Sequence, residues 1–496
     1  MTLDAHLPAL QVIVPLMTAP IAAIARARGL PWLAATAASL MAFAIALAML
    51  GPVLAGEVLT YQMGGWAPPF GIELRIDAFN ALLLLVVTGA SSAALLIARR
   101  SIDAQIAEDR QPLFYAAWLL ALAGLAGIAA TGDAFNIFVF MEISSLASYI
   151  LIAGGPDRRA LTAVFKYLVM GTTGATFYLI GVGLIYMMTG TLNLADMAER
   201  LAEVGDLKPI LVAAGFITVG LALKAAVFPL HVWLPNAYTW APHAVTVFMA
   251  ACSTKVALYV LLRFDFVVFQ GNLAGHDLQF GGFLMPLAVL AFLVASGVAL
   301  LEKNLKRLLA FSSVAQIGYI LLGASLVTGA GLTASALHMF NHALAKGALF
   351  LAVACLGLRF ARLRLEDLAG AAKHMPLTMG AFVLAGLSLV GVPGTAGFIS
   401  KWYLIEAVLE HEALRVWLIA AILVSSLMAL AYIWRVVEAA YFGTPAEGAE
   451  RVREAPAWML AVTWAAALAN VWYGLNPALP IELSTRSAAL LLGGAP

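Results

Sequence analysis

Long apolar segments, separated by short polar ones, follow one another along almost the whole chain. The hydrocarbon core of a bilayer is about 30 Å thick, so a helix needs about 20 apolar residues to cross it. By this measure the pattern predicts about fourteen membrane-spanning helices. Their expected ranges are 7–25, 31–50, 77–98, 112–131, 134–154, 160–189, 209–234, 240–263, 282–301, 308–328, 332–358, 376–408, 414–442 and 456–475. Several ranges exceed the usual length, and there we expect tilted, broken or extended helices.

The composition supports the same class. The chain has 496 residues, of which 63% are hydrophobic and 11% are charged, and its mean hydropathy is +0.95. These values are typical of an all-α polytopic membrane protein and exclude a soluble one. No loop is long enough for a soluble domain, so we expect one membrane domain over 1–496. We find no basic run that would bind nucleic acid.

The two cysteines, Cys252 and Cys355, lie in apolar segments. They support neither a disulfide framework nor a zinc site, and there is no iron–sulfur motif. We therefore expect no metal or other cofactor. Electron transfer by this chain itself is excluded.

Basic residues set the expected orientation, because cytoplasmic loops of membrane proteins carry an excess of Lys and Arg. With the N-terminus outside, sixteen of the 28 basic residues fall inside and six outside, and the rest lie within spans. An even number of spans then places the C-terminus outside as well. The range 7–25 lacks a basic leader, so we expect a retained span rather than a cleaved signal. The predicted location is the bacterial inner (plasma) membrane.

Two parts of the chain resemble each other. Tyr149 matches Tyr319, Lys166 aligns with His338, and His231 aligns with Lys401, at separations of 170 to 172 residues. We expect two five-helix units, 112–263 and 282–442, preceded by three helices in 1–111 and followed by one helix and a tail in 456–496. Because five is odd, the two units should lie inverted in the membrane.

The motif LALKAAVFPLHVWLP, 221–235, places Lys224, Pro229 and His231 together at membrane depth. Proline removes a helical hydrogen bond, so we expect the seventh span to be broken. A lysine in the membrane costs roughly 2.5–3.5 kcal/mol on insertion scales, which favours a functional role. The alternative is a snorkelling lysine beside a structural kink. In the twelfth span the segment GVPGTAG, 391–397, predicts a second break just before Lys401.

Glu142 lies about a third of the way into the fifth span and is the natural partner of Lys224. A carboxylate that moves could switch this lysine between its charged and neutral forms. The alternative is a static ion pair that only holds helices together.

Further titratable groups lie in later spans. Lys255 is too deep for comfortable snorkelling, while His338, His342 and Lys346 share one stripe at i, i+4 and i+8. His-x-x-x-His is also metal spacing, but no third ligand is evident, so a hydrated relay is favoured. Hydrogen-bonded structural lysines are the alternative.

Together these groups predict a proton path along the membrane midplane. The main residues are Glu142, Lys224, Lys255, His338 and Lys401, and the auxiliary ones are His231, His342, Lys346 and Lys166.

Several stretches resemble the antiporter-like subunits shared by respiratory complex I, membrane-bound hydrogenases and Mrp-type cation/proton antiporters. They are MEISSLASYIL, LKAAVFPLHVWLPNAYTWAPHAV, STKVALYVLLR, HMFNHALAKGALFL and GVPGTAGFISKWYL. The resemblance covers essentially the whole chain. It implies a fourteen-helix fold with inverted five-helix units and two broken helices.

The resemblance also implies roles for particular residues. Glu142 and Lys224 would be the coupling pair, Lys255 and His338 the central relay, and Lys401 the distal exchange residue. Lysine at 401 is similar to the Mrp D-type or the complex I L-type subunit, and the short tail favours the D-type. Where the family often has aspartate after the helix-breaking Leu-Pro, this chain has Asn236.

We therefore expect a proton-translocating subunit of a multisubunit monovalent cation (Na⁺)/proton antiporter. Its partners would be other membrane subunits, lipid, protons and Na⁺ or another monovalent cation. The alternative is the equivalent proton-pumping subunit of a redox complex, such as a complex I-like NADH:quinone oxidoreductase or a membrane-bound hydrogenase.

In either case the chain is a transporter or translocase subunit rather than an enzyme by itself. A self-sufficient transporter for an organic solute is disfavoured, because the ionisable groups are spread over several helices. A scaffold with purely structural charges remains the last alternative.

Overall fold

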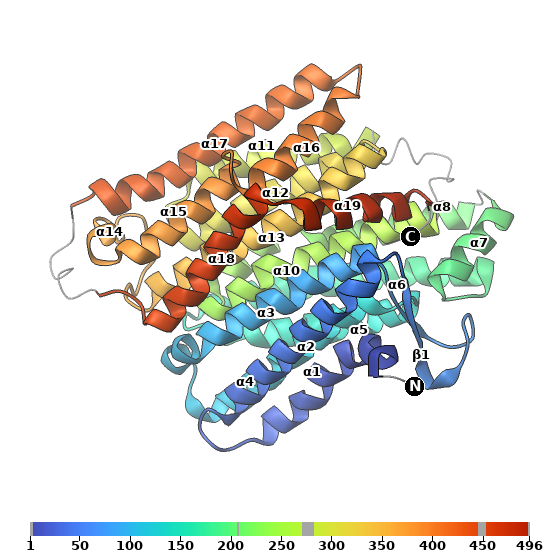
Figure 1. Ribbon diagram of the computed structural model, residues 1–496, viewed down its shortest axis with the longest axis horizontal. Coiled ribbons are helices and arrows are strands. Elements are labelled where there is room, and N and C mark those ends of the chain that lie inside the picture. Colours follow the sequence, from blue (N-terminus) through green and yellow to red (C-terminus); the bar gives the residue numbers. More distant parts are fainter. Residues whose placement is uncertain (1–2, 206–207, 270–281, 445–452, 495–496) are drawn as a thin grey trace.

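The computed structural model describes residues 3–205, 208–269, 282–444 and 453–494. Within them the chain forms a bundle of long helices that run side by side, with most helix ends at two opposite faces (Figure 1).

The elements follow one another along the described chain with two strands near the N-terminus and helices elsewhere. Their bounds are η1 Leu3–His6, α1 Leu7–Ile24, α2 Leu30–Leu54, β1 Leu59–Gln62, η2 Met63–Gly65, β2 Glu73–Ile76, α3 Ala78–Gln105, η3 Glu108–Arg110, α4 Gln111–Ala130, α5 Ala134–Ala153, α6 Arg159–Thr189, α7 Leu194–Val204, α8 Lys208–Ala225, α9 Trp233–Trp240, α10 His243–Leu262, η4 Arg263–Val268, α11 Met285–Leu301, α12 Leu305–Ser325, α13 Gly329–Gly357, α14 Ala371–His374, α15 Pro376–Val390, α16 Ala396–Leu409, α17 Arg415–Phe442, α18 Ala457–Leu475 and α19 Ala478–Leu491.

The two faces of the bundle are named by the short helices that they carry. One face carries a β-hairpin, α7 and the connection between α16 and α17, and we call it the α7 face (Figure 1). The opposite face carries α14 and the connection between α3 and α4, and we call it the α14 face.

Thirteen helices in the described residues are long and apolar enough to cross a membrane. The remaining predicted crossing, 376–408, is divided into α15 and α16, each of which is too short to be counted alone. The fold therefore agrees with the hydropathy pattern, which predicted about fourteen crossings. The predicted all-α polytopic membrane fold is confirmed.

Both predicted breaks are present. Helix α8 ends at Ala225 and α9 begins only at Trp233, with Ala226 in the left-handed region at φ 56°. Helix α15 ends at Val390, and the next residue, Gly391, has φ 92°. Only glycine adopts that conformation without steric cost, so Gly391 allows the chain to leave one half-helix and enter the next.

The helix neighbours follow the same order in the two predicted units. In the first unit α4 packs on α5, α5 on α6, and α6 on α8. In the second unit α11 packs on α12, α12 on α13, and α13 on both α15 and α16. Helices α10, α12 and α13 lie at the centre and are buried almost all round, although they carry buried lysines and histidines.

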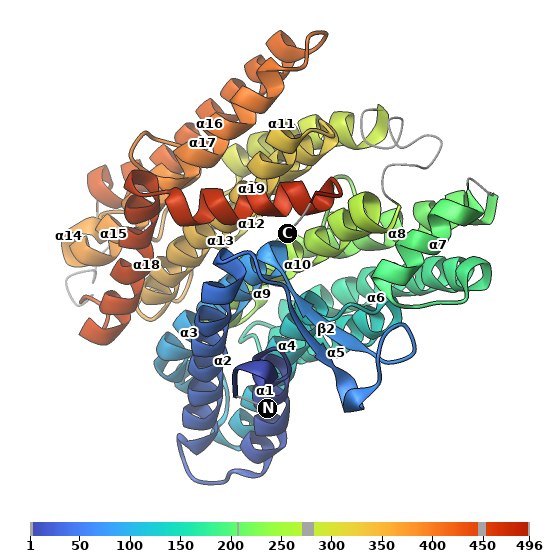
Figure 2. The ribbon, with the colours of Figure 1, turned by 45° about the vertical axis from the view of Figure 1, so that its right-hand side comes forward.

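Two features were not predicted. The 51–76 loop contains the antiparallel pair β1 and β2. The residues after α18 form α19, which leaves the end of α18 at an angle and packs on α13 and α3 (Figure 2). Helix α18 ends against the second break, where Gly474 meets the backbone of Gly394 and Thr395 so closely that a Cβ would lie 2.4 Å away.

Candidate functional site

Glu142 on α5 and Lys224 on α8 form the ion pair that the sequence predicted. Lys224 Nζ lies 3.5 Å from Glu142 Oε1 and donates a hydrogen bond to Ser145 Oγ at 2.7 Å. The lysine side chain is 6% exposed and the glutamate side chain 25%. The ammonium is therefore enclosed, whereas its counterion lies partly at the edge of the molecule.

The break after α8 explains the position of Lys224. The lysine occupies the last turn of α8, where the unpaired carbonyls and the helix dipole favour a cation. Trp233 Nε1 donates to the carbonyl of Leu223 at 2.9 Å, and Val227 N donates to that of Ala222 at 2.9 Å. The half-helix end is thus satisfied by one group within the break and one beyond it.

A small cavity of about 30 Å³ adjoins Lys224. Its polar lining includes Ser144 and Ser148 of α5, Tyr167 of α6 and Ser253 of α10. A space of this size can hold a water molecule, and hydroxyl groups are suitable partners for it. The cavity extends the ion pair toward α10.

His231 lies in the break itself. Its ring stacks on Phe228 at 5.2 Å and approaches Phe311 of α12 at 6.3 Å. It therefore stands where the first unit meets the second.

Lys255 on α10 is fully buried, and its Nζ donates to the carbonyl of Ala250 at 2.5 Å. It adjoins a cavity of about 10 Å³ between α3, α10 and α13, which Met339 and Phe340 also line. Ser253, near Lys255 on the same helix, lines the cavity of Lys224 instead. The two lysines therefore do not share a cavity, and their cavities adjoin different faces of α10.

His338 on α13 links three helices. Its Nδ1 lies 2.8 Å from Ser400 Oγ on α16, and its Nε2 lies 2.9 Å from Gln316 Oε1 on α12. The amide oxygen of Gln316 can only accept, so Nε2 carries a proton that it donates. Nδ1 then accepts from Ser400 when the imidazole is neutral.

The predicted stripe on α13 continues from His338. His342 stacks on His338 with 6.2 Å between ring centroids, and neither of its ring nitrogens has a partner within the described residues. Lys346, one turn further, donates to the carbonyl of Leu309 at 2.7 Å and to the hydroxyl of Ser312. All three titratable side chains of the stripe are buried.

Lys401 on α16 reaches back across the second break. Its Nζ donates to the carbonyl of Val390 at 2.7 Å and to Ser426 Oγ at 3.1 Å. The ammonium therefore caps the C-terminus of the half-helix α15, a favourable place for a cation. It also lies 5.0 Å from the ring centroid of Tyr319, and that ring lies 5.6 Å from His338.

The second unit thus holds a continuous series of contacts from Lys401 through Tyr319 and His338 to His342.

The ammonium groups of Lys224 and Lys401 both lie at half-helix ends, but Lys224 lies before its break and Lys401 after its own. The sequence comparison of the two units aligned His231 with Lys401, but His231 lies in a break and Lys401 lies inside a half-helix. These aligned residues therefore do not occupy equivalent places.

Lys166 is not part of the buried series. It is exposed on α6 together with its neighbour Phe165 and with Val169. Its side chain makes no hydrogen bond or ion pair within the described residues. Its predicted auxiliary role therefore has no support from contacts within this chain.

Sequence reasoning missed three polar groups. Gln316 and Ser400 hold His338, and a single amide within an apolar span was a signal that could have identified Gln316. Lys306 falls between the predicted spans 282–301 and 308–328, so the pattern predicts a loop position, but the residue is buried and donates to the carbonyl of Ala241 at 2.7 Å. Helix α12 begins at Leu305, before the apolar pattern starts, which explains this error. Within the described residues there is no group of three or more His, Cys, Asp or Glu side chains that could hold a metal ion.

Residues 131–429 match the family described as NADH:quinone oxidoreductase/Mrp antiporter, transmembrane. The chain belongs to this family. It is 44% identical over 462 residues to the NADH-quinone oxidoreductase subunit N of Desulforudis audaxviator, a match that covers 92% of this chain and 90% of that protein. It is 31% identical over 414 residues to the D-type subunit of the Na(+)/H(+) antiporter of Bacillus subtilis, covering 83% and 82%. These relatives do not single out the D-type over the oxidoreductase type.

A chain in the structure of the Mrp complex from Dietzia sp. DQ12-45-1b superposes with a TM-score of 0.90 at 30% identity, covering 99% of this chain and 98% of that one. The resemblance predicted from the motifs is confirmed. The protein is a multi-pass membrane protein and an antiporter-like subunit of a hetero-oligomeric complex of the Mrp or complex I type.

Proposed function

We propose that this chain is the proton-translocating subunit of a multisubunit monovalent cation (Na⁺)/proton antiporter. Glu142, Lys224, Lys255, His338 and Lys401 would pass protons along the membrane plane. The observation that carries the proposal is the loose ion pair at Lys224. The buried ammonium has one carboxylate at 3.5 Å, and Glu142 Oε1 has no hydrogen-bond partner within the described residues.

Such a pair can act as a switch. A buried ammonium is stable while a carboxylate stands beside it, and it loses that stabilisation when the carboxylate moves away. Because Glu142 is partly exposed, it can turn toward a cation of a neighbouring subunit. Lys224 would then release its proton into the adjoining cavity, toward α10.

The central and distal groups can continue the transfer. His338 has one nitrogen that donates and one that accepts, so it can take a proton on one side and release one on the other. The unpartnered ring nitrogens of His342 suit it to bridge between the α13 stripe and Lys255. Lys401 then exchanges the proton at the second break.

The antiporter assignment is supported by the D-type relative from Bacillus subtilis and by the superposition along nearly the full length of the Mrp chain. A second candidate, the proton-pumping subunit of a redox complex, is favoured by the 44% identity to the oxidoreductase relative. In that case electron transfer in partner subunits, rather than a cation gradient, would move Glu142.

The two candidates differ in what drives proton movement. The intact complex is purified with its native partners and reconstituted in vesicles that contain a pH-sensitive dye. We expect a pH change on addition of Na⁺ without any electron donor, and partner subunits that lack iron–sulfur clusters. A pH change that requires NADH or reduced ferredoxin would instead establish the redox candidate.

A further inference from the structure

Lys306, near the start of α12, is a buried amine that the proposed proton path does not use. The residue is 3% exposed, and its Nζ donates to the carbonyl of Ala241 at 2.7 Å. Among the described residues it takes part in no ion pair. The first turn of a helix also disfavours a cation, because the N–H groups there carry partial positive charge. An ammonium that is buried, unpaired and unfavourably placed is a candidate for a group that gives up its proton.

The charged neighbours along the chain do not stabilise Lys306. Arg307 donates to Glu302 Oε1 through Nε at 2.8 Å and to the neutral Asn236 Oδ1 through Nη1 at 3.1 Å. The carboxylate of Glu302 is therefore bonded to the arginine, and Lys306 is left with the neutral carbonyl of Ala241. Arginine keeps its proton at physiological pH, whereas a lysine can lose its own. Of these two neighbouring cations, Lys306 is the one that can exchange a proton.

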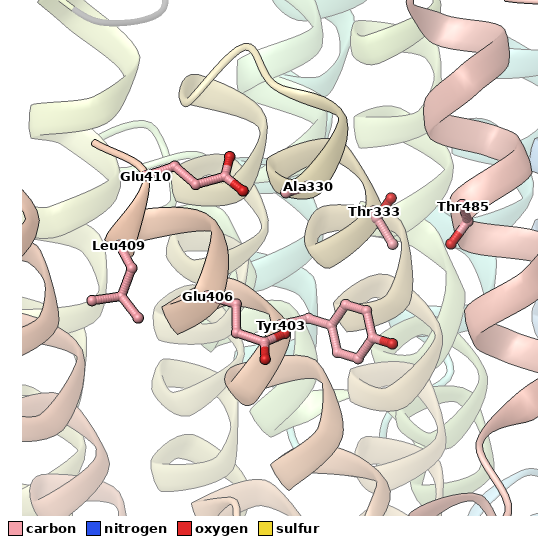
Figure 3. Close-up of a pocket in the computed structure, with 7 residues that line it drawn as sticks. All are labelled: Ala330, Thr333, Tyr403, Glu406, Leu409, Glu410 and Thr485. Atoms are coloured by element: carbon pink, nitrogen blue, oxygen red, sulfur yellow. The ribbon is translucent and has the colours of Figure 1, made fainter. Parts of the chain in front are cut away.

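Titratable groups at the opposite, α7 face are in a different environment. Glu406 and Glu410 of α16 line a recess of about 470 Å³, and both residues are exposed (Figure 3). Exposed carboxylates are solvated by water and need no partner within the protein. The enclosed amine of Lys306 cannot be solvated in this way, so its lack of a counterion requires another explanation.

His243 lies close to Lys306 at the α14 face. It is the first residue of α10 and follows, by two positions, the residue whose carbonyl binds Lys306. Its backbone N–H donates to Gln105 Oε1 at the end of α3, at 3.3 Å. The residue is partly exposed, yet its buried Nδ1 has no hydrogen-bond partner within the described residues. Buried polar atoms are nearly always bonded in folded proteins, so this free nitrogen at the border of surface and interior is a second sign of proton exchange.

Helix α12 connects Lys306 with the stripe on α13. Lys346 of that stripe donates to the carbonyl of Leu309 and to the hydroxyl of Ser312. These residues follow Lys306 by three and six positions, about 4.5 and 9 Å along the helix axis. One helix thus carries a buried amine at its start and binds a second buried amine one to two turns deeper.

We propose that His243 and Lys306 form an entry through which protons from the α14 face reach Lys346 and the stripe on α13. The inference rests on the proposed function and adds to it a branch that runs across the membrane rather than along it. The imidazole accepts a proton at one ring nitrogen and releases one from the other. The neutral amine of Lys306 accepts that proton on its lone pair, and the resulting ammonium gives one proton to the amine of Lys346.

The alternative is a structural lysine that only binds the carbonyl of Ala241, and arginine separates the two roles. Lys306→Arg keeps a cation that can donate to this carbonyl but cannot release its proton. Lys303→Arg makes the same change at an exposed lysine three residues earlier and is the matched control. Both variants are measured in the intact complex, by melting temperature and by cation-dependent pH change in vesicles.

His243→Ala is tested by chemical rescue. The substitution opens a space at the border of the protein that imidazole can enter, because the residue is partly exposed. Pyrazole has the same shape but is too weak a base to carry protons near neutral pH. Each additive is also given to the wild type and to Lys224→Ala, which corrects for buffering and for passage of the additive across the bilayer.

We expect Lys306→Arg to assemble with an unchanged melting temperature and to slow the pH change roughly tenfold or more, while Lys303→Arg leaves the rate unchanged. We expect imidazole, but not pyrazole, to restore the rate in His243→Ala. Normal transport in Lys306→Arg would overturn the proposal, and so would equal effects of the two additives on His243→Ala. Should Lys306→Arg fail to assemble, the rescue of His243→Ala decides alone.

Lys224→Ala distinguishes failure of this inference from failure of the proposed function. Loss of transport in Lys224→Ala together with normal transport in Lys306→Arg would contradict the entry alone. Normal transport in Lys224→Ala would contradict the proposed function, and the entry with it.

Discussion

Lys224 Nζ stands 3.5 Å from Glu142 Oε1 and is held at 2.7 Å by Ser145, which lies one turn after that glutamate on α5. The lysine therefore keeps a neutral hydrogen-bond partner on α5 even when the carboxylate moves. A static pair that served only to hold α5 and α8 together would gain more from a tight, fully bonded carboxylate. The loose geometry suits a carboxylate that moves toward and away from the Lys224 ammonium.

Ser145→Ala tests this arrangement. The substitution removes the hydroxyl that holds Nζ but leaves the carboxylate in place. We expect slower proton transport with normal assembly, because the ammonium would then depend on Glu142 alone and be released less readily. The rate of proton transport is measured as the initial rate of pH change in vesicles. Ser487→Ala, which removes a buried hydroxyl of α19 that lines neither the cavity of Lys224 nor that of Lys255, is the control.

Gly391→Ala and Gly394→Ala form a second pair of test variant and control. Both glycines have positive φ, 92° and 86°, so alanine strains the backbone at either site by about 1–2 kcal/mol. At Gly391 a Cβ would also lie 2.9 Å from Lys401 Cδ, whereas at Gly394 nothing lies within 4 Å. We expect Gly391→Ala to reduce proton transport far more than Gly394→Ala, at similar losses of melting temperature. Equal transport in the two variants would show that transport does not depend on the position of the Lys401 side chain beside Gly391.

Lys401→Met removes the donor that caps α15 while keeping a long side chain. The carbonyl of Val390 then loses its bond, which should destabilise the protein by about 1–3 kcal/mol. We expect transport to be abolished. Lys401→Arg restores a cation but not a group that can release its proton, so it should recover stability without transport. Recovery of transport in the arginine variant would argue for a purely structural lysine.

The two histidines of α13 should respond differently to substitution. His338→Ala leaves Gln316 Oε1 without its partner and Ser400 Oγ with only the carbonyl of Gly397, so we expect a loss of about 1–3 kcal/mol in stability together with loss of transport. His342→Ala breaks no hydrogen bond found in the described residues, so its loss of stability comes from the cavity left by a buried ring alone and should be smaller than that of His338→Ala, while transport falls. Thermal unfolding of the complex and vesicle pH assays separate the two effects. Normal transport in His342→Ala would exclude His342 from the proton path.

Much of the fold could be predicted because a bilayer leaves few choices. Spanning segments must satisfy their backbone groups internally, so apolar runs of sufficient length are helices. Pro229 and the cluster around Gly391 marked the two breaks correctly, since each prevents normal helical hydrogen bonding. The bend between α18 and α19 was missed because the second of these helices is too short and too polar to resemble a span.

The site was only partly predictable for a different reason. Helical spacing correctly placed His338, His342 and Lys346 on one stripe. Spacing cannot show that Lys401 reaches back to the carbonyl of Val390, nor that Gln316 holds His338, because these contacts arise from tertiary packing. The burial of Lys306 was hidden by a helix that begins before its apolar pattern.

The central claim is that Glu142 and Lys224 switch proton release and do not merely hold helices together. The most direct measurement is the cation-dependent pH change in vesicles that contain the assembled complex with Glu142→Gln or Lys224→Ala. Lys373→Ala, an exposed lysine of α14, serves as the control. We predict that both pair variants assemble normally and lose the pH change, while the control retains it. A normal pH change in either pair variant would contradict the account.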